Sequence, residues 1–289
     1  MMRMMKIYVL ILGLALGMWS CDDFLTVRPK SDILESDLFA TSVGVEDALY
    51  GVYAKLGQSA LYGEDMTWGV VDLMAQYFLL NTNHGSDRYA VAQFSHENTD
   101  ARARYGAMWI QMYQTIGYTN NLINALSAKD ENSMRYYSIY LGEALGVRAF
   151  LHFDLYRLFC PDVKLSPRAE GIPYNKEFGV ALPPMYTVEE FVQLVINDLK
   201  EAETLLVGDP IVSTVPYTLG TKSDADKYVA RMNLYSVKAM LARAYQAKGD
   251  NVKAVAYAKE VIESGKFRLL EFASVDQTEA LSDVLFSDE

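Results

Sequence analysis

Apolar residues recur at three- and four-residue steps along most of the chain, and this spacing predicts α-helices. Three polar or proline-rich stretches interrupt the pattern, and strand-like alternation is almost absent. Helices are predicted over residues 42–57, 105–126, 134–159, 188–206, 234–248 and 252–264. We therefore expect an all-α protein with long irregular loops.

Several helix ends carry recognisable signals. Ser42 is the expected cap of the first helix, and Thr187 with Glu190 forms a capping box before the fourth. Pro161 is expected to stop the helix over 134–159. Gly142 and Gly146 within that helix would allow a neighbouring segment to approach closely.

The interruptions predict loops. Residues 81–100 are rich in Asn, Asp, Ser and Gly, and loops of such length are often functional. Residues 162–186 lie among several prolines and are expected to be irregular. A further polar excursion is expected over 208–226.

The last two helices have the spacing of a tetratricopeptide repeat. Ala242 and Ala254 would permit close contact, Tyr245 would fill the gap between the helices, and Gly249 would make the turn. An ordinary helical hairpin uses the same residue types and remains the alternative. Repeats stack in groups of three or more, so the other helices would supply divergent copies of an α-solenoid-like scaffold.

The N-terminus has the pattern of a secretion signal. Two basic residues precede the apolar run 7–18, and the run ends at Trp19-Ser20-Cys21. A cysteine after a small residue at this place resembles the bacterial lipobox, so we expect residues 1–20 to be a signal peptide and Cys21 to be lipidated. A simple cleavage site beside an ordinary cysteine is the alternative. No later segment is long and apolar enough to span a membrane.

Composition and net charge exclude some classes of partner and of stabilising site. The chain has 289 residues, 51% apolar, and its 26 basic and 37 acidic side chains give a net charge of −11. Such a field repels a phosphate backbone, so nucleic acid is a poor candidate partner. The two cysteines cannot form a disulfide framework or a four-cysteine zinc site, and stability must come from packing.

The residues that usually carry chemistry form no recognised motif. His152 lies on an apolar helical stripe and is expected to be a hydrogen-bonded packing residue, whereas His84 and His96 lie in the polar loop without a metal-ligand spacing. Cys160 ends a helix and is expected to be an inert, buried thiol. We therefore predict no catalytic residue, no metal and no cofactor.

Several segments together resemble the SusD/RagB family of Bacteroidota outer-membrane lipoproteins. The lipobox-like Cys21 is followed by Asp22-Asp23-Phe24-Leu25, and the strongest match is the run 143–159, which reads EALGVRAFLHFDLYRLF. Further matching segments are Leu38-Phe39, Ala48 to Tyr53, Trp109 to Asn121, Gly171-Ile172-Pro173 and Leu241 to Phe267. The resemblance covers residues 21 to about 270.

The resemblance implies a fold, a place and a function. Residues 21–289 would form a SusD-like N-terminal helical domain with tetratricopeptide-like helix pairs, clearest at 234–264. The protein would be a non-enzymatic, lipid-anchored lipoprotein of the outer membrane, exposed at the cell surface. It would bind a nutrient, usually a glycan, and deliver the oligosaccharide to a SusC-like TonB-dependent transporter.

Candidate ligand-binding residues lie in the polar loop. Sugar rings present apolar faces that suit aromatic side chains, and their hydroxyls suit amide and carboxylate partners. The candidates are Asn81, Asn83, Asp87, Arg88, Tyr89 and Phe94, and a merely solvated loop is the alternative. Trp109 and Tyr113 recur at helical spacing and are expected to be core residues.

Two other function classes stay open. A membrane-tethered tetratricopeptide scaffold would bind other proteins and no glycan of its own, and a secreted hydrolase would use carboxylates brought together by folding. Members of the resembled family continue well beyond this length, and their later half supplies much of the aromatic platform. The chain is therefore expected to be a natural short form or part of a longer protein.

Overall fold

The computed structural model describes residues 35–78, 80, 87–179, 181, 183–213 and 230–267. The chain divides into two compact units, residues 1–38 and 39–289. In the first, the short helix α3 (Glu35–Leu38) is the described element. The predicted signal peptide 1–20, Cys21 and much of the excursion 208–226 lie outside the described residues.

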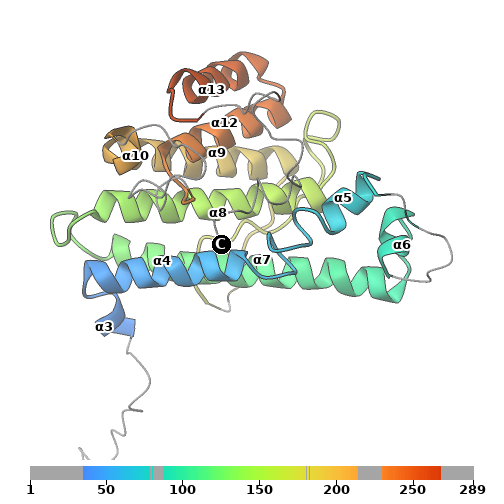
Figure 1. The fold of residues 1–289 in the computed structure, drawn as a ribbon, viewed down its shortest axis with the longest axis horizontal. Coiled ribbons are helices and arrows are strands. Elements are labelled where there is room, and N and C mark those ends of the chain that lie inside the picture. Colours follow the sequence, from blue (N-terminus) through green and yellow to red (C-terminus); the bar gives the residue numbers. More distant parts are fainter. Residues whose placement is uncertain are drawn as a thin grey trace, which may run out of the picture. The chain divides into compact units, whose positions relative to one another are not determined.

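The second unit is a stack of helices (Figure 1). Helix α8 packs against α7 on one side and α9 on the other, α12 packs on α9, and α13 packs on α12. The long helices are α4 (Ser42–Leu56), α7 (Thr99–Ser127), α8 (Tyr137–Phe159), α9 (Val188–Leu205), α12 (Leu234–Lys248) and α13 (Asn251–Glu263). The short ones are α5 (Val70–Met74), α6 (Asp87–Ala92), the 3-10 turn η1 (Leu206–Gly208) and α10 (Pro210–Ser213).

Helix α8 is the centre of the stack. Its side chains from Tyr140 to Ala149 are all buried, so the helix is covered on every face and not on one stripe alone. The predicted close approach at its glycines is confirmed. A Cβ on Gly142 would lie 2.8 Å from Leu206, and one on Gly146 would lie 2.6 Å from Met232.

The helix signals in the sequence mostly match the structure. The capping box of Thr187 and Glu190 is present at α9, and α8 ends two residues before Pro161. The cap of α4 is Thr41, whose hydroxyl accepts from the backbone N–H of Gly44, so the prediction of Ser42 was wrong by one residue. Both hydroxyl residues suit a cap, and backbone geometry selects the first.

The prediction of one continuous loop over 81–100 was wrong in part. Residues 87–92 form α6, and Ala90, Val91 and Ala92 are buried. Helix α7 begins already at Thr99, where the side chain of Asn98 accepts from two backbone N–H groups. The polar residues of this stretch thus include helix caps and not only loop.

The predicted helix pair at 234–264 is confirmed as α12 and α13. Gly249 takes a left-handed conformation with φ +87°, which lets the chain turn between the helices. The rings of Tyr245 and Tyr257 stack across the pair, with centroids 5.7 Å apart.

The fold class is all-α and tetratricopeptide-like, as predicted. Within the described ranges the only β interaction is an isolated bridge between Glu170 and Thr187. No helix among those residues combines the length and apolar character needed to cross a membrane.

A buried polar network fixes residues 173–178, which we call the strap, against the stack. The guanidinium of Arg148 donates two hydrogen bonds to Asp198, at 2.7 and 3.0 Å. Asp198 also accepts from the hydroxyl of Tyr174 at 2.6 Å, and Arg148 donates to Asn120 at 3.2 Å. All four side chains are buried.

His152 belongs to the same network and is a packing histidine, as predicted. Its Nε2 accepts from the backbone N–H of Asn175 at 3.0 Å, so its Nδ1 carries the proton and donates to the carbonyl of Arg148 at 2.9 Å. Complete burial lowers the pKa of His152 to about 3. The ring is therefore neutral, and its two nitrogens join α8 to the strap.

Candidate functional site

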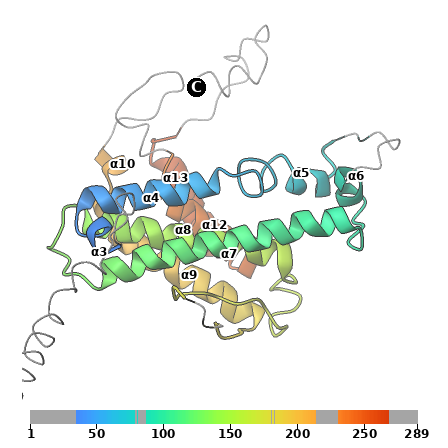
Figure 2. The same ribbon diagram turned by 90° about the horizontal axis from the view of Figure 1, so that it is seen from below.

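An open cleft of about 680 Å³ lies between the turns before α5, the first turn of α6 and the N-terminal half of α7. We call it the α6 cleft. The two views show α5 and α6 together at the N-terminal end of α7 (Figures 1 and 2). The polar side chains that line the α6 cleft include Glu64, Asp65, Asp87, Asp100, Arg104 and Gln111.

Charged side chains from three segments meet in the α6 cleft. Arg104 on α7 contacts Asp65 at 2.6 Å and also binds Asp87 on α6. Arg88, one residue further along α6, contacts Glu64 at 3.1 Å. Two guanidinium groups and three carboxylates thus form one partly exposed cluster.

The pKa values of the two carboxylates that Arg104 binds are shifted in opposite directions. The hydrogen bond from Arg104 lowers the pKa of Asp87 below its ordinary value. Burial raises the pKa of Asp65, and Arg104 opposes that rise. Asp87 is accordingly an ionised, partly exposed acceptor in the lining of the cleft, suited to hydrogen bonds from hydroxyl groups.

Of the six predicted ligand residues, the structure brings Asp87 and Arg88 into this cluster. Tyr89 is half-buried on α6, whereas Phe94 beyond the helix is 48% exposed. Phe94 has φ +54° and lies edge-on to His96, with ring centroids 6.3 Å apart. Positive φ is uncommon for a bulky residue and is associated with functional positions.

The remaining two predicted residues, Asn81 and Asn83, lie outside the described residues. Their part in ligand binding stays a prediction.

Three exposed aromatic residues near the α6 cleft were missed by the sequence analysis. Trp68 is 54% exposed in the turns before α5, and Tyr77 and Phe78 are 79% and 47% exposed just after it. α5 and α6 pack against each other, so these rings come from segments beside the cleft. Trp68 lies in a segment with no apolar helical stripe, so burial in a helix interface does not account for this aromatic residue. That was the signal in the sequence that could have identified it as exposed.

Two other predicted features concern reactive groups. Cys160 is half-buried, and burial raises the pKa of its thiol to about 11, which keeps it protonated at neutral pH. In the part of the chain that the structure describes, no three His, Cys, Asp or Glu side chains gather as a metal site would require.

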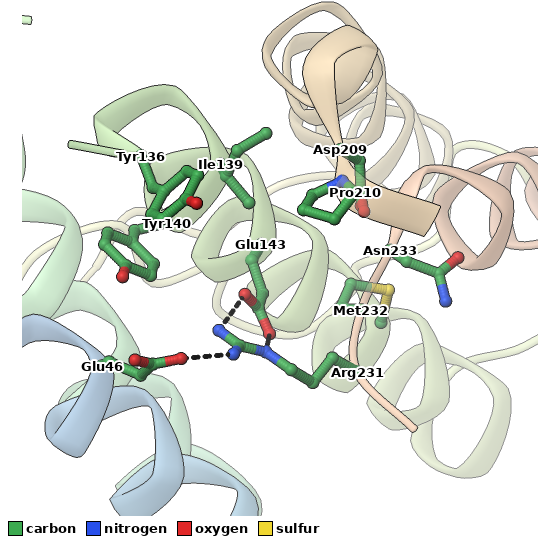
Figure 3. Close-up of a pocket in the computed structure, with 10 residues that line it drawn as sticks. All are labelled: Glu46, Tyr136, Ile139, Tyr140, Glu143, Asp209, Pro210, Arg231, Met232 and Asn233. Atoms are coloured by element: carbon green, nitrogen blue, oxygen red, sulfur yellow. Dashed lines mark hydrogen bonds and ion pairs between the residues drawn. The ribbon is translucent and has the colours of Figure 1, made fainter. Parts of the chain in front are cut away.

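A second, smaller pocket of about 110 Å³ lies around Arg231 (Figure 3). Arg231 donates to both carboxylate oxygens of Glu143 at 2.6 Å and to Glu46 at 3.0 Å. Asp209 accepts from the backbone N–H groups of Ile211 and Leu234. Because these acidic groups are engaged within the protein, we interpret this pocket as a junction that joins α4 and α8 to the segment before α12.

Comparison with known proteins places the chain in a family. Residues 23–234 match the family described as SusD-like, starch-binding associating with outer membrane. The chain belongs to this SusD-like family. The matched residues include the whole α6 cleft and end at the first residue of α12. The rest of the tetratricopeptide-like pair α12–α13 of this SusD-like chain follows the matched residues.

Individual proteins that are similar to this chain are also described as SusD-like. SusD-like protein P38 of Formosa agariphila is 28% identical over 185 residues, which are 64% of this chain and 34% of that protein. A SusD superfamily protein of Bacteroides thetaiotaomicron has a TM-score of 0.62 at 21% identity, covering 81% of this chain and 49% of its own. A SusD-like carbohydrate binding protein of Bacteroides vulgatus has a TM-score of 0.62 at 20% identity, covering 80% and 47%.

These structural matches establish that this SusD-like chain shares the helical fold. The chain spans about a third of the Formosa protein and about half of the two solved structures.

Proposed function

We propose that this chain is a non-enzymatic nutrient-binding lipoprotein that binds oligosaccharide at the α6 cleft. It is held in the outer membrane through lipid on Cys21, is exposed at the cell surface, and delivers its ligand to a SusC-like TonB-dependent transporter. The observation that carries the proposal is the match of residues 23–234 to a family described as starch-binding and associating with the outer membrane. The Bacteroides vulgatus relative is described as a carbohydrate binding protein, which supports the same ligand class.

The chemistry of the α6 cleft supports the proposal. Asp87 and Glu64 offer acceptors for hydroxyl groups, and Arg88 and Arg104 offer donors. Phe94 does not line the cleft, but it lies two residues after α6 and exposes a ring onto which the apolar face of a longer sugar chain can pack. A cleft of this volume lies within the range of small-ligand sites.

Binding is tested by electrophoresis of the protein through gels that contain neutral polysaccharides, including starch, β-glucan, xylan and mannan. We expect at least one polysaccharide to retard the protein, and we expect R88Q and F94A to reduce the retardation. L165A is the matched control, because Leu165 is 84% exposed and lies in the turn after α8. Equal retardation of all variants would contradict the placement of the ligand at the α6 cleft.

Anchoring and delivery are tested on native membranes. The protein is affinity-purified in mild detergent, and intact masses are measured for it and for every protein retained. We expect acyl chains on Cys21, their loss in C21A, and a co-purifying TonB-dependent barrel. Intact cells treated with proteinase should lose the protein, and protection from the proteinase would contradict surface exposure.

A protein-binding scaffold is the second candidate function. Helix α13 has no buried residue, and Val252, Val255 and Ile262 are 83%, 53% and 74% exposed. Exposed apolar side chains of this kind favour a protein partner. A stable complex without any TonB-dependent barrel, together with no retardation by any polysaccharide, would support the scaffold over the nutrient-binding lipoprotein.

A further inference from the structure

A second open groove, of about 610 Å³, lies between α7 and the strap. We call it the aromatic groove. Four aromatic side chains line it, and polar groups stand between them. Its lining residues include Trp109, Tyr113, Tyr118, Asn175, Glu177 and Phe178.

Trp109 and Tyr113 were expected to be core residues, and the structure corrects that expectation. Both are half-buried and line the aromatic groove. Their rings are 4.8 Å apart, and Phe159 packs edge-on behind Trp109 at 5.0 Å. Helical spacing places these residues on one side of α7 but cannot tell whether another segment covers that side.

The strap forms a fixed wall of the groove. The side-chain amide of Asn120 donates to the carbonyls of Asn175 and Glu177 at 3.1 and 3.2 Å. The hydroxyl of Tyr113 donates to the carbonyl of Pro173 at 2.7 Å, and His152 accepts from the backbone of Asn175. The buried network therefore holds the wall in place before any ligand arrives, which lowers the entropic cost of binding.

The groove extends along the helix over more than one ring. Trp109 and Tyr118 are nine residues apart, which is about 13.5 Å along the axis of an α-helix and half a turn around it. Between them the surface over Gly117 is open, since apart from the helix backbone and the adjacent residues Ile116 and Tyr118 no atom lies within 4 Å of the position that a Cβ would take. A flat ligand can thus approach the helix backbone between the rings.

We propose that the aromatic groove is a second binding site, for neutral pyranose oligosaccharides, separate from the α6 cleft. Tyr118 and Phe178 are 50% and 52% exposed and offer rings for the apolar faces of sugars. Gln114, Asn175 and Glu177 offer hydrogen-bonding groups for hydroxyls. The carboxylate of Glu177 is balanced by the ammonium of Lys55, which lies 5.9 Å from the centroid of the Tyr118 ring, so the groove carries no excess charge that would favour an anionic ligand.

The groove and the α6 cleft lie on neighbouring stripes of one helix. The cleft is lined by Ala107 and Gln111, whereas the groove is lined by Ile110, Gln114 and Gly117. Each set follows steps of three or four residues, which is one stripe of an α-helix. The inference rests on the proposed function for the ligand class, and the groove supplies a separate place for that ligand.

The chain itself offers separate reporters for the two sites. Its three tryptophans are Trp19, Trp68 and Trp109, of which Trp68 lies three residues after Asp65 of the α6 cleft and Trp109 lines the groove. In the full chain carrying W19F, a further W68F leaves Trp109 as the single tryptophan, and W109F leaves Trp68; excitation at the red edge of tryptophan absorption avoids the tyrosines. Each variant is titrated with neutral oligosaccharides of glucose, mannose, galactose and xylose, and with oligogalacturonate as the anionic control.

We expect at least one neutral oligosaccharide to change the emission of Trp109 in a saturable way, and we expect no change with oligogalacturonate. Y118A and F178A should each weaken this binding about tenfold, since each removes one stacking ring. Y118F should preserve it. Both truncated side chains are half exposed, so urea unfolding of these variants should match that of the parent.

The outcomes separate the two sites. A response of Trp68 alone overturns the groove as a binding site and supports the proposed function, and a response of Trp109 alone supports the groove and contradicts the α6 cleft. No response of either reporter to any neutral sugar overturns both. A Trp109 response that Y118A and F178A leave unchanged also overturns the groove, as does tighter binding of oligogalacturonate.

Discussion

Two regions of the molecule are each built around an arginine that binds carboxylates, and they differ in exposure. Arg148 and Asp198 beneath the strap have 5% and 2% of their side chains exposed. Arg104 and Asp87 in the α6 cleft have 22% and 30% exposed. When one member of a buried ion pair is removed, the other is left as a poorly compensated charge in the protein interior. In an exposed ion pair, water can take the place of the missing partner. The first region joins the strap to the stack, whereas the second leaves its charged groups accessible to water.

The largest effect is expected from R148M, which removes the guanidinium from the buried carboxylate of Asp198 and leaves it with the hydroxyl of Tyr174 and the more distant ammonium of Lys176 at 3.7 Å. We expect a loss of about 3–5 kcal/mol in the free energy of unfolding, measured by urea denaturation. R102M is the matched control, since Arg102 is exposed on α7 and should change stability by less than about 0.5 kcal/mol. Similar losses in the two variants would mean that Arg148 contributes no more to stability than an exposed arginine does.

N120A tests how the buried region holds the strap. It removes two hydrogen bonds to strap carbonyls and leaves Arg148 with one partner fewer, so we expect a loss of about 1–3 kcal/mol. Amide hydrogen exchange in residues 173–178 should also become faster. N124A, an exposed asparagine one turn later on α7, should change neither quantity.

The pH dependence of stability reports on His152. Its folded pKa of about 3 lies below its ordinary 6.5, so the unfolded chain binds this proton first as the pH falls. The stability from neutral His152 is full above about pH 6.5 and is lost progressively toward pH 3. Between pH 7 and pH 5 the parent should lose about 2 kcal/mol more than H152Q, as measured by urea denaturation at both values. An equal loss would show that His152 is not buried in neutral form.

The smallest effect is expected in the exposed cluster. R88M removes a contact to Glu64 in which Arg88 is 53% exposed, and we expect a loss of at most about 1 kcal/mol. Raising the salt to about 1 M should abolish even this difference, since the charges are accessible to ions. A salt-independent loss of several kcal/mol would mean that this cluster is structural like the one around Arg148.

The sequence predicted helices better than it predicted surfaces. Periodicity located α4, α8, α9 and the α12–α13 pair, because each of these helices buries apolar side chains at helical spacing or has a strong cap. It missed α6, whose six residues are too few for a periodic signal.

The candidate site was only partly predictable. Asp87 and Arg88 were recognised as polar loop residues, but their partners Glu64 and Arg104 are 24 and 17 residues distant from them. The sequence did not predict the aromatic groove. Its second wall is the strap, and Pro173 at the start of the strap lies 60 residues after its hydrogen-bond partner Tyr113 on α7. Local spacing carries no information on which segment covers a helix face.

The junction around Arg231 has a consequence for the order in which the chain can fold. Arg231 and Glu46 are 185 residues apart, and Arg231 and Glu143 are 88 apart. During synthesis from the N-terminus, α4 and α8 emerge well before the cation that neutralises their carboxylates. Such long-range closure slows folding. The carboxylates of Glu46 and Glu143 therefore have to wait for residue 231 before they gain this cationic partner.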